Sequence, residues 1–152
     1  RVKDVRDELK NHPNMSELNN GNGVFYHVET PEDAANAMQA AQTTNPQIQG
    51  WALVGGWPLF TQNALKWPPG SVKVVSVDAL PAEIPYVTDG YVQALYAQDC
   101  YGWGYKSVQI LLDKIESGKD PSSARIIDPL TRVTKENAKE YAKKWDKWLK
   151  QE

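Results

Sequence analysis

The stretch Val72-Lys73-Val74-Val75-Ser76-Val77-Asp78 decides the fold, because a run of β-branched residues that ends at a carboxylate predicts a buried strand. Other predicted strands cover residues 24–28, 49–55 and 91–97, with a short candidate at 125–128. Helical patterns separate them, and apolar strands that alternate with helices are typical of a parallel sheet covered on both faces. The sequence therefore predicts an α/β fold, three-layer and doubly wound, with a mainly parallel sheet.

The predicted helices begin and end at recognisable residues. Thr30 can cap the free N–H groups of a helix that has Pro31 in its first turn and stops at Asn45-Pro46. Residues 102–118 carry an apolar stripe and end at a glycine, as helices often do. Further helices are predicted at 1–10, 59–65, 81–89 and 134–151. Because the chain opens on a helix, we expect a sheet without its first strand or the later part of a longer protein.

Composition excludes several classes of function. The 152 residues suit one domain, and 41% hydrophobic with 24% charged residues is a globular balance. A net charge of −2 argues against nucleic acid as a partner. Cys100 stands alone beside two histidines, so we predict no disulfide, no metal and no cofactor. Motifs for nucleophilic, phosphate-binding and dinucleotide-binding chemistry are absent, so we predict a binding protein and not an enzyme.

Ligands of open parallel sheets lie at the carboxyl ends of the strands, a rule that selects residues 29–30, 56–57, Asp78 and Gln98. Asp78 could accept hydrogen bonds from two hydroxyls of one ligand, or cap the helix after Pro81. Trp57 could stack on the C–H face of a pyranose, or fill a packing void. The Gln98 amide suits sugar hydroxyls, or could bridge backbone groups. Thr30 is interpreted as a helix cap.

Four stretches together resemble type I periplasmic binding proteins, the ribose and glucose/galactose group that feeds ABC sugar importers. The first is the strand that ends at Asp78, and the second is Asp89-Gly90-Tyr91-Val92-Gln93-Ala94-Leu95-Tyr96-Ala97-Gln98, similar to a "D-G-x-x-x-A-x-x-x-Q" strand. The third is the following helix at 102–118, and the fourth is Val133-Thr134-Lys135-Glu136-Asn137, similar to "V-T-x-E-N". The likeness runs in order over almost the whole chain.

The resemblance implies that residues 1–152 are the C-terminal lobe of a two-lobe protein whose N-terminal lobe is missing. It places the helix at 102–118 with that opposite lobe, so its apolar stripe would be exposed. It also implies that Asp78 and Gln98 contact ligand and that Arg1 falls where several members bind ligand through an arginine. Trp57 stands where many relatives have a polar contact, and the family's aromatic near residues 30–33 is absent, which leaves Trp57 or Trp103 to stack.

The function implied is capture of a monosaccharide by hinge closure and its delivery to an ABC permease in the membrane, in the periplasm or at the cell surface. The alternative is the effector domain of a LacI-type transcription regulator, which shares the fold but needs a helix-turn-helix, and the region for it is not in this sequence. The Lys-rich stretch 135–150 favours the transporter. A flavodoxin-like enzyme or receiver domain lacks support, because neither a first strand nor an acidic pair is found.

Overall fold

A four-stranded sheet organises the chain, which the computed structural model describes over residues 1–150. The strands are β1 (Gly50–Leu53), β2 (Lys73–Val77), β3 (Ala94–Ala97) and β4 (Thr131–Val133), in the order β1-β2-β3-β4. The first three are parallel and β4 runs antiparallel to β3, with Val77 opposite Tyr96. The predicted α/β class and mainly parallel sheet are confirmed. The carboxyl ends of β1, β2 and β3 therefore meet at one edge of the sheet.

Helices gather on one face of this sheet and make a single core. Residues of α2 (Pro31–Thr44), α3 (Ile84–Thr88), α5 (Ala138–Leu149) and the 3-10 turn η2 (Trp57–Phe60) belong to the same buried cluster as Val74, Leu95 and Val133. Thr30 caps α2 as predicted, since its hydroxyl accepts the Asp33 N–H at 3.3 Å. On the other face, Val75 and Tyr96 are 40% and 39% exposed. The strand β2 therefore alternates in burial and is not buried along its whole length.

The strand predicted at 24–28 does not form within the sheet. This segment has no strand hydrogen bonding, and Tyr26 is 87% exposed. Phe25 rests on the ring of Trp51, with centroids 5.4 Å apart, but a groove of about 860 Å³ lies between α1 (Val2–Leu9), this segment and the outer edge of β1. A β-forming sequence needs a neighbouring strand to pair with, and none of the described residues fills that place.

Other element boundaries also differ from the prediction. The predicted strand at 125–128 is irregular, and the pairing partner of β3 is Thr131–Val133 instead. The helix predicted at 59–65 is replaced by η2, and the last helix begins at Ala138, because Thr134 and Asn137 form a turn before it. Its predicted end at residue 151 lies outside the described residues. The helix at 102–118 is confirmed as α4 (Cys100–Ser117), closed by Gly118 at φ +69°.

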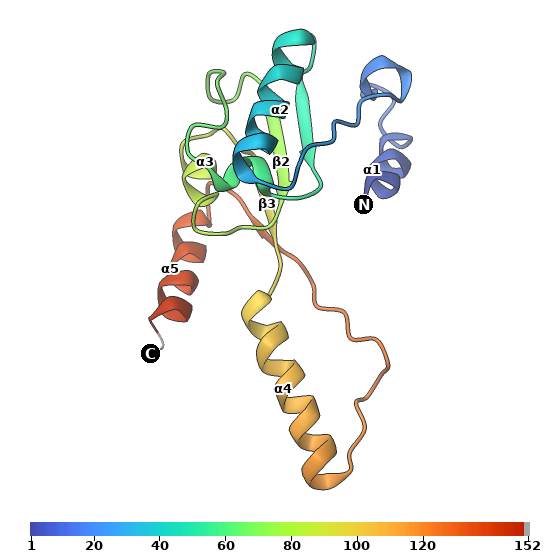
Figure 1. The fold of residues 1–152 in the computed structure, drawn as a ribbon, viewed down its shortest axis with the longest axis vertical. Coiled ribbons are helices and arrows are strands. Elements are labelled where there is room, and N and C mark those ends of the chain that lie inside the picture. The colour runs from blue at the N-terminus through green and yellow to red at the C-terminus, as the bar shows by residue number, and fades with distance from the viewer. Residues whose placement is uncertain (151–152) are drawn as a thin grey trace.

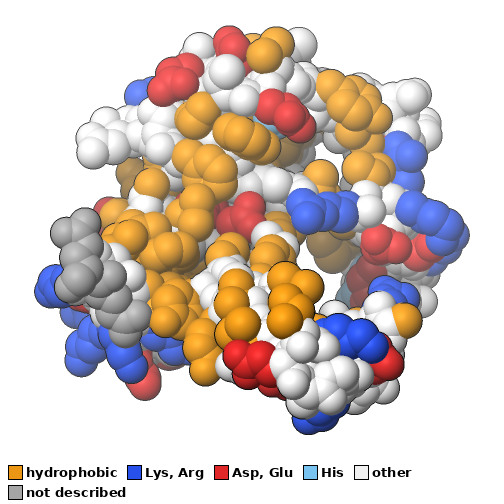
Figure 2. All heavy atoms as spheres, turned by 60° about the horizontal axis from the view of Figure 1, so that its bottom comes forward, with side chains coloured by type: hydrophobic (Ala, Val, Ile, Leu, Met, Phe, Trp, Pro, Cys, Tyr) orange, Lys and Arg blue, Asp and Glu red, His pale blue; other side chains and the backbone are white. Residues whose placement is uncertain are grey.

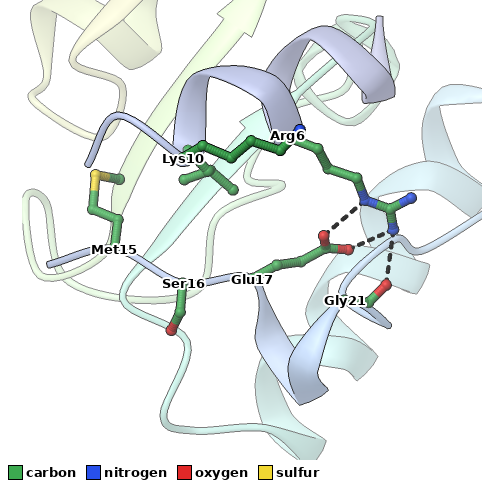
Figure 3. Close-up of a pocket in the computed structure, with 7 residues that line it drawn as sticks. Arg6, Lys10, Met15, Ser16, Glu17 and Gly21 are labelled. Atoms are coloured by element: carbon green, nitrogen blue, oxygen red, sulfur yellow. Dashed lines mark hydrogen bonds and ion pairs between the residues drawn. The ribbon is translucent and has the colours of Figure 1, made fainter. Parts of the chain in front are cut away.

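The amino-terminal helix α1 is held to the following turn by one ion pair. Arg6 donates from Nε and Nη2 to the two carboxylate oxygens of Glu17, at 2.8 and 2.7 Å, and from Nη2 to the Gly21 carbonyl at 2.8 Å (Figure 3). The Glu17 carboxylate raises the pKa of Arg6, and Arg6 lowers the pKa of Glu17. This pair fixes the 3-10 turn η1 (Leu18–Asn20) against α1.

The helix α4 projects away from the sheet, and residues 118–130 return alongside it (Figure 1). Only Gly102 of α4 is buried, whereas Leu111 and Ile115 are 61% and 77% exposed. Apolar side chains gather on this side of the molecule (Figure 2). The exposure expected for this stripe is therefore observed. None of the helices within residues 1–150 has both the length and the apolar character needed to cross a membrane.

Leu59 tests where the core lies. It is 0% exposed in η2, between α2 and the sheet, so we expect Leu59→Ala to lower the free energy of unfolding by about 2–5 kcal/mol. The matched control Leu111→Ala removes the same atoms from the exposed face of α4 and should change it by about 0.5 kcal/mol or less. Urea unfolding followed by Trp fluorescence measures both. Equal losses in the two variants would contradict the described core.

Candidate ligand-binding site

The site is built around Asp78, the residue that follows β2. Its backbone adopts φ +76°, a left-handed conformation that few residues other than glycine adopt, though aspartate tolerates it better than most. Its N–H still donates to the carbonyl of Tyr96 on β3, at 3.0 Å. The strand is therefore paired up to Asp78 and the chain then turns sharply away from the sheet.

The carboxylate of Asp78 joins the ends of three strands. The Gln98 side-chain amide, just after β3, donates to Oδ1, and the Gly56 backbone N–H, in the loop after β1, donates to Oδ2 at 3.3 Å. Three of the positions selected by the strand-end rule thus meet at one place. The alternative role of Asp78 as a helix cap is not found, because α3 begins at Ile84 and has no side-chain cap.

Trp57 and Arg1 lie near this cluster, but the contacts of their side chains are with other residues. Trp57 directly follows Gly56, is half-buried, and packs on Phe60 with ring centroids 5.6 Å apart and planes tilted by 56°. The exposed guanidinium of Arg1 donates to the carbonyl of Val54 at 2.9 Å, so Arg1 sits at the carboxyl end of β1. Thr30 is engaged as the cap of α2 and Trp103 lies on the exposed α4.

Two hydrogen bonds hold the backbone of the residues that follow Asp78. The indole N–H of Trp145, on α5, donates to the carbonyl of Ala79 at 2.8 Å. The backbone N–H of Leu80 donates to Oε2 of Glu83 at 2.7 Å. Both bonds are formed by residues that sequence analysis did not select, and both lock the turn that presents the Asp78 carboxylate.

Glu83 is the unexpected member of the site. It is fully buried, and its Oε1 has no hydrogen-bond partner among residues 1–150. Burial raises the pKa of Glu83 to about 8; the bond from Leu80 opposes this increase, and the charge of Asp78 adds to it. One signal in the sequence could have found it: a glutamate three residues after Leu80, with Pro81 between them, matches half of a capping box.

The residues at the start of α4, next to Gln98, have a structural role. The carboxylate of Asp99 accepts the Gly102 N–H at 3.0 Å and caps the helix. A β-carbon on Gly102 would lie 1.9 Å from Oδ2 of Asp99, so a larger residue there would displace the carboxylate that caps the helix. Burial, and then the charge of Asp78, raises the pKa of the Cys100 thiol, which makes it a weak nucleophile at neutral pH.

The arrangement offers hydrogen-bond acceptors at an edge where a ligand can reach them. Asp78 and Gln98 are both partly exposed and carry carboxylate and amide oxygens, while Trp57 adds an aromatic ring next to Gly56. Within the described chain, no three metal-binding side chains form a group that could hold an ion. This chemistry suits a neutral ligand with several hydroxyl groups.

Comparison with known proteins identifies the family and the fold of this chain. The sequence matches the family described as "Periplasmic binding protein domain" over residues 1–120. The chain belongs to this family. No curated protein matches the sequence.

Several solved structures share the fold of this chain. An ABC transporter solute-binding protein from Agrobacterium vitis, bound with α-D-tagatopyranose, has a TM-score of 0.74 at 20% identity and is matched over 92% of this chain and 46% of its own. A periplasmic ribose ABC transporter protein from Conexibacter woesei gives 0.64 at 22% identity, over 81% and 43%. A LacI transcriptional regulator from Bacteroides fragilis gives 0.58 at 18%, over 72% and 38%. The chain thus spans less than half the length of these proteins.

Gly56 tests the packing of the site. A β-carbon there would lie 2.7 Å from the Phe60 ring and 2.8 Å from Oε1 of Glu83, so we expect Gly56→Ala to destabilise the protein by about 1–3 kcal/mol. The control Gly104→Ala meets no atom within 4 Å on α4 and should stabilise it by about 0.5–1 kcal/mol. Thermal unfolding of both variants measures the difference. A neutral Gly56→Ala would show that the loop does not pack on Glu83.

Proposed function

We propose that this chain is part of the substrate-binding component of an ABC-type importer and that it binds a monosaccharide. The observation that carries the proposal is the meeting of Asp78, Gln98 and the Gly56 loop at the carboxyl edge of a parallel sheet. Membership of the periplasmic binding protein family supports it, as do the sugars named for structures of the same fold.

Each residue has a distinct part in the proposed complex. The carboxylate of Asp78 accepts hydrogen bonds from two adjacent sugar hydroxyls, because it has lone pairs beyond those used by Gln98 and Gly56. Gln98 adds a further polar contact just after β3, where the resemblance to the family places the hinge. Trp57 stacks on the apolar face of the sugar ring after a rotation from Phe60, and Arg1 donates from the end of β1.

The complete protein is proposed to have a second, N-terminal lobe. The matched structures are about twice as long as this chain, and α4 presents an apolar stripe that no other described residue covers. We assign residues 102–118 to packing against that lobe. Closure of the two lobes over the sugar would then present it to the permease, outside the cytoplasm, with no chemical step and no cofactor.

The effector-binding domain of a LacI-type regulator is the second candidate, favoured by the fold shared with the Bacteroides fragilis regulator. The two functions differ in what lies outside these residues. A regulator carries a DNA-binding helix-turn-helix with a basic surface in a separate domain. An operator-binding assay of the complete protein separates them.

Sugar binding is tested by calorimetry on the complete two-lobe protein with D-ribose, D-arabinose and D-tagatose. For a sugar that binds, Asp78→Asn should weaken binding roughly 10- to 150-fold, since hydrogen bonds to a charged group contribute about 1.5–3 kcal/mol. Asparagine keeps the shape and tolerates the left-handed backbone. Asp89→Asn, at an exposed position, is the matched control. Unchanged affinity in Asp78→Asn would remove the basis of the proposal.

The isolated 152 residues should bind these sugars weakly or not at all, because half of the proposed cleft is absent. The same titration on the fragment measures this. Micromolar affinity would contradict the two-lobe site.

The stripe on α4 is tested by light scattering of the isolated chain. We expect self-association at high concentration, because Leu111 and Ile115 are exposed, and its reduction in the double variant Leu111→Ser, Ile115→Ser. Glu116→Ser, on the same helix, should leave it unchanged. Self-association that persists in the double variant would show that another surface is responsible for it.

A further inference from the structure

We infer that Glu83 is a positioning residue of the ligand site: its buried carboxyl group fixes the Asp78 turn and the Gly56 loop in the geometry that receives ligand. This rests on the proposed function only for the identity of the site. Glu83 itself is fully buried, so it acts through Asp78 and Gly56 and not by touching a sugar.

The first contact of Glu83 closes the turn that follows Asp78. Its Oε2 accepts the Leu80 N–H at 2.7 Å, while its own N–H donates to the Leu80 carbonyl at 2.9 Å. These reciprocal bonds fix residues 80–83 as one turn. Since Ala79 is also held by Trp145, the backbone on the exit side of Asp78 has little freedom.

The second contact reaches the opposite side of Asp78. Oε1 of Glu83 lies against Gly56, so close that a β-carbon there would come within 2.8 Å of it. The Gly56 N–H in turn donates to Oδ2 of Asp78 at 3.3 Å. Glu83 therefore supports both backbone segments that flank the Asp78 carboxylate.

The surroundings of Glu83 favour its neutral form. The titratable groups that interact with it are acids: Asp78 after β2 and Tyr141 on α5. Tyr141 in turn interacts with Cys100 and Asp99 at the start of α4. No ion pair within residues 1–150 involves Glu83. Ionisation would leave a buried carboxylate without a cation and next to a second negative charge.

A pH dependence follows, with a definite sign. The folded-state pKa of about 8 lies above the ordinary 4.5, so the folded chain keeps a proton that the unfolded chain has lost between those values. The contribution of Glu83 to the free energy of unfolding is fully present below pH 4.5. It decreases as the pH rises and is lost once the pH has passed through 8. The arrangement of Asp78 and Gly56 should loosen in the last part of this range, where Glu83 ionises in the folded protein.

Carbon-13 NMR of the 152-residue chain tests the inference without any sugar. We expect the Glu83 carboxyl signal to titrate with a midpoint near pH 8 and the Gly56 Cα and Gln98 side-chain carbonyl signals to move with the same midpoint. Glu83→Gln should hold both reporters at their pH 6 positions up to pH 9.5. Glu83→Ala should displace them at every pH, and Glu116→Gln should reproduce the wild-type profile.

Two results would overturn the inference: a Glu83 midpoint near 4.5, or a Gly56 titration that survives in Glu83→Gln. The wild-type titration decides the question alone if the variants fail to fold. Because no ligand is present, a failure here is distinct from a failure of sugar binding, which the calorimetry on the complete protein reports separately.

Discussion

The sharp turn at Asp78 is the constraint on which the site depends. A residue other than glycine at φ +76° persists only where its surroundings hold it, and here four groups do so. Gln98 and Gly56 bond the carboxylate, and Trp145 and Glu83 bond the backbone just beyond it. The carboxylate is therefore placed by bonds from the loop after β1, the end of β3, the turn before α3, and α5. A ligand that binds it meets a preorganised acceptor.

This placement depends on a balance between burial and charge. Asp78 is partly exposed, whereas Glu83 is fully buried and its Oε1 lies against Gly56. Burial raises the pKa of the Glu83 carboxyl group to about 8, so this group is neutral at pH 7. The partly exposed carboxyl group is available to a ligand, and the buried one serves as a neutral support.

The strand-end rule predicted the meeting of Asp78, Gln98 and the Gly56 loop, because parallel strands bring their carboxyl ends together whatever the details of packing. It could not predict Glu83, since whether a glutamate is buried depends on segments remote in sequence. The prediction at 24–28 was wrong for a related reason: β-branched and aromatic residues favour a strand only where a partner strand exists, and a groove separates this segment from β1. The roles of Trp57 and Arg1 as ligand contacts remain predictions.

The proposed ligand site and the start of α4 are adjacent in the sequence. Gln98 bonds Asp78, and the next residue, Asp99, caps α4 through the Gly102 N–H. The direction in which α4 leaves the sheet is thus set within the few residues that form the proposed ligand site. A helix with one buried residue gains little from the sheet beside it, so its apolar stripe needs a surface elsewhere. With that surface on a second lobe, as proposed, a hydroxyl bound at Asp78 and Gln98 acts on the point where the two lobes join, and binding is coupled to closure by geometry alone.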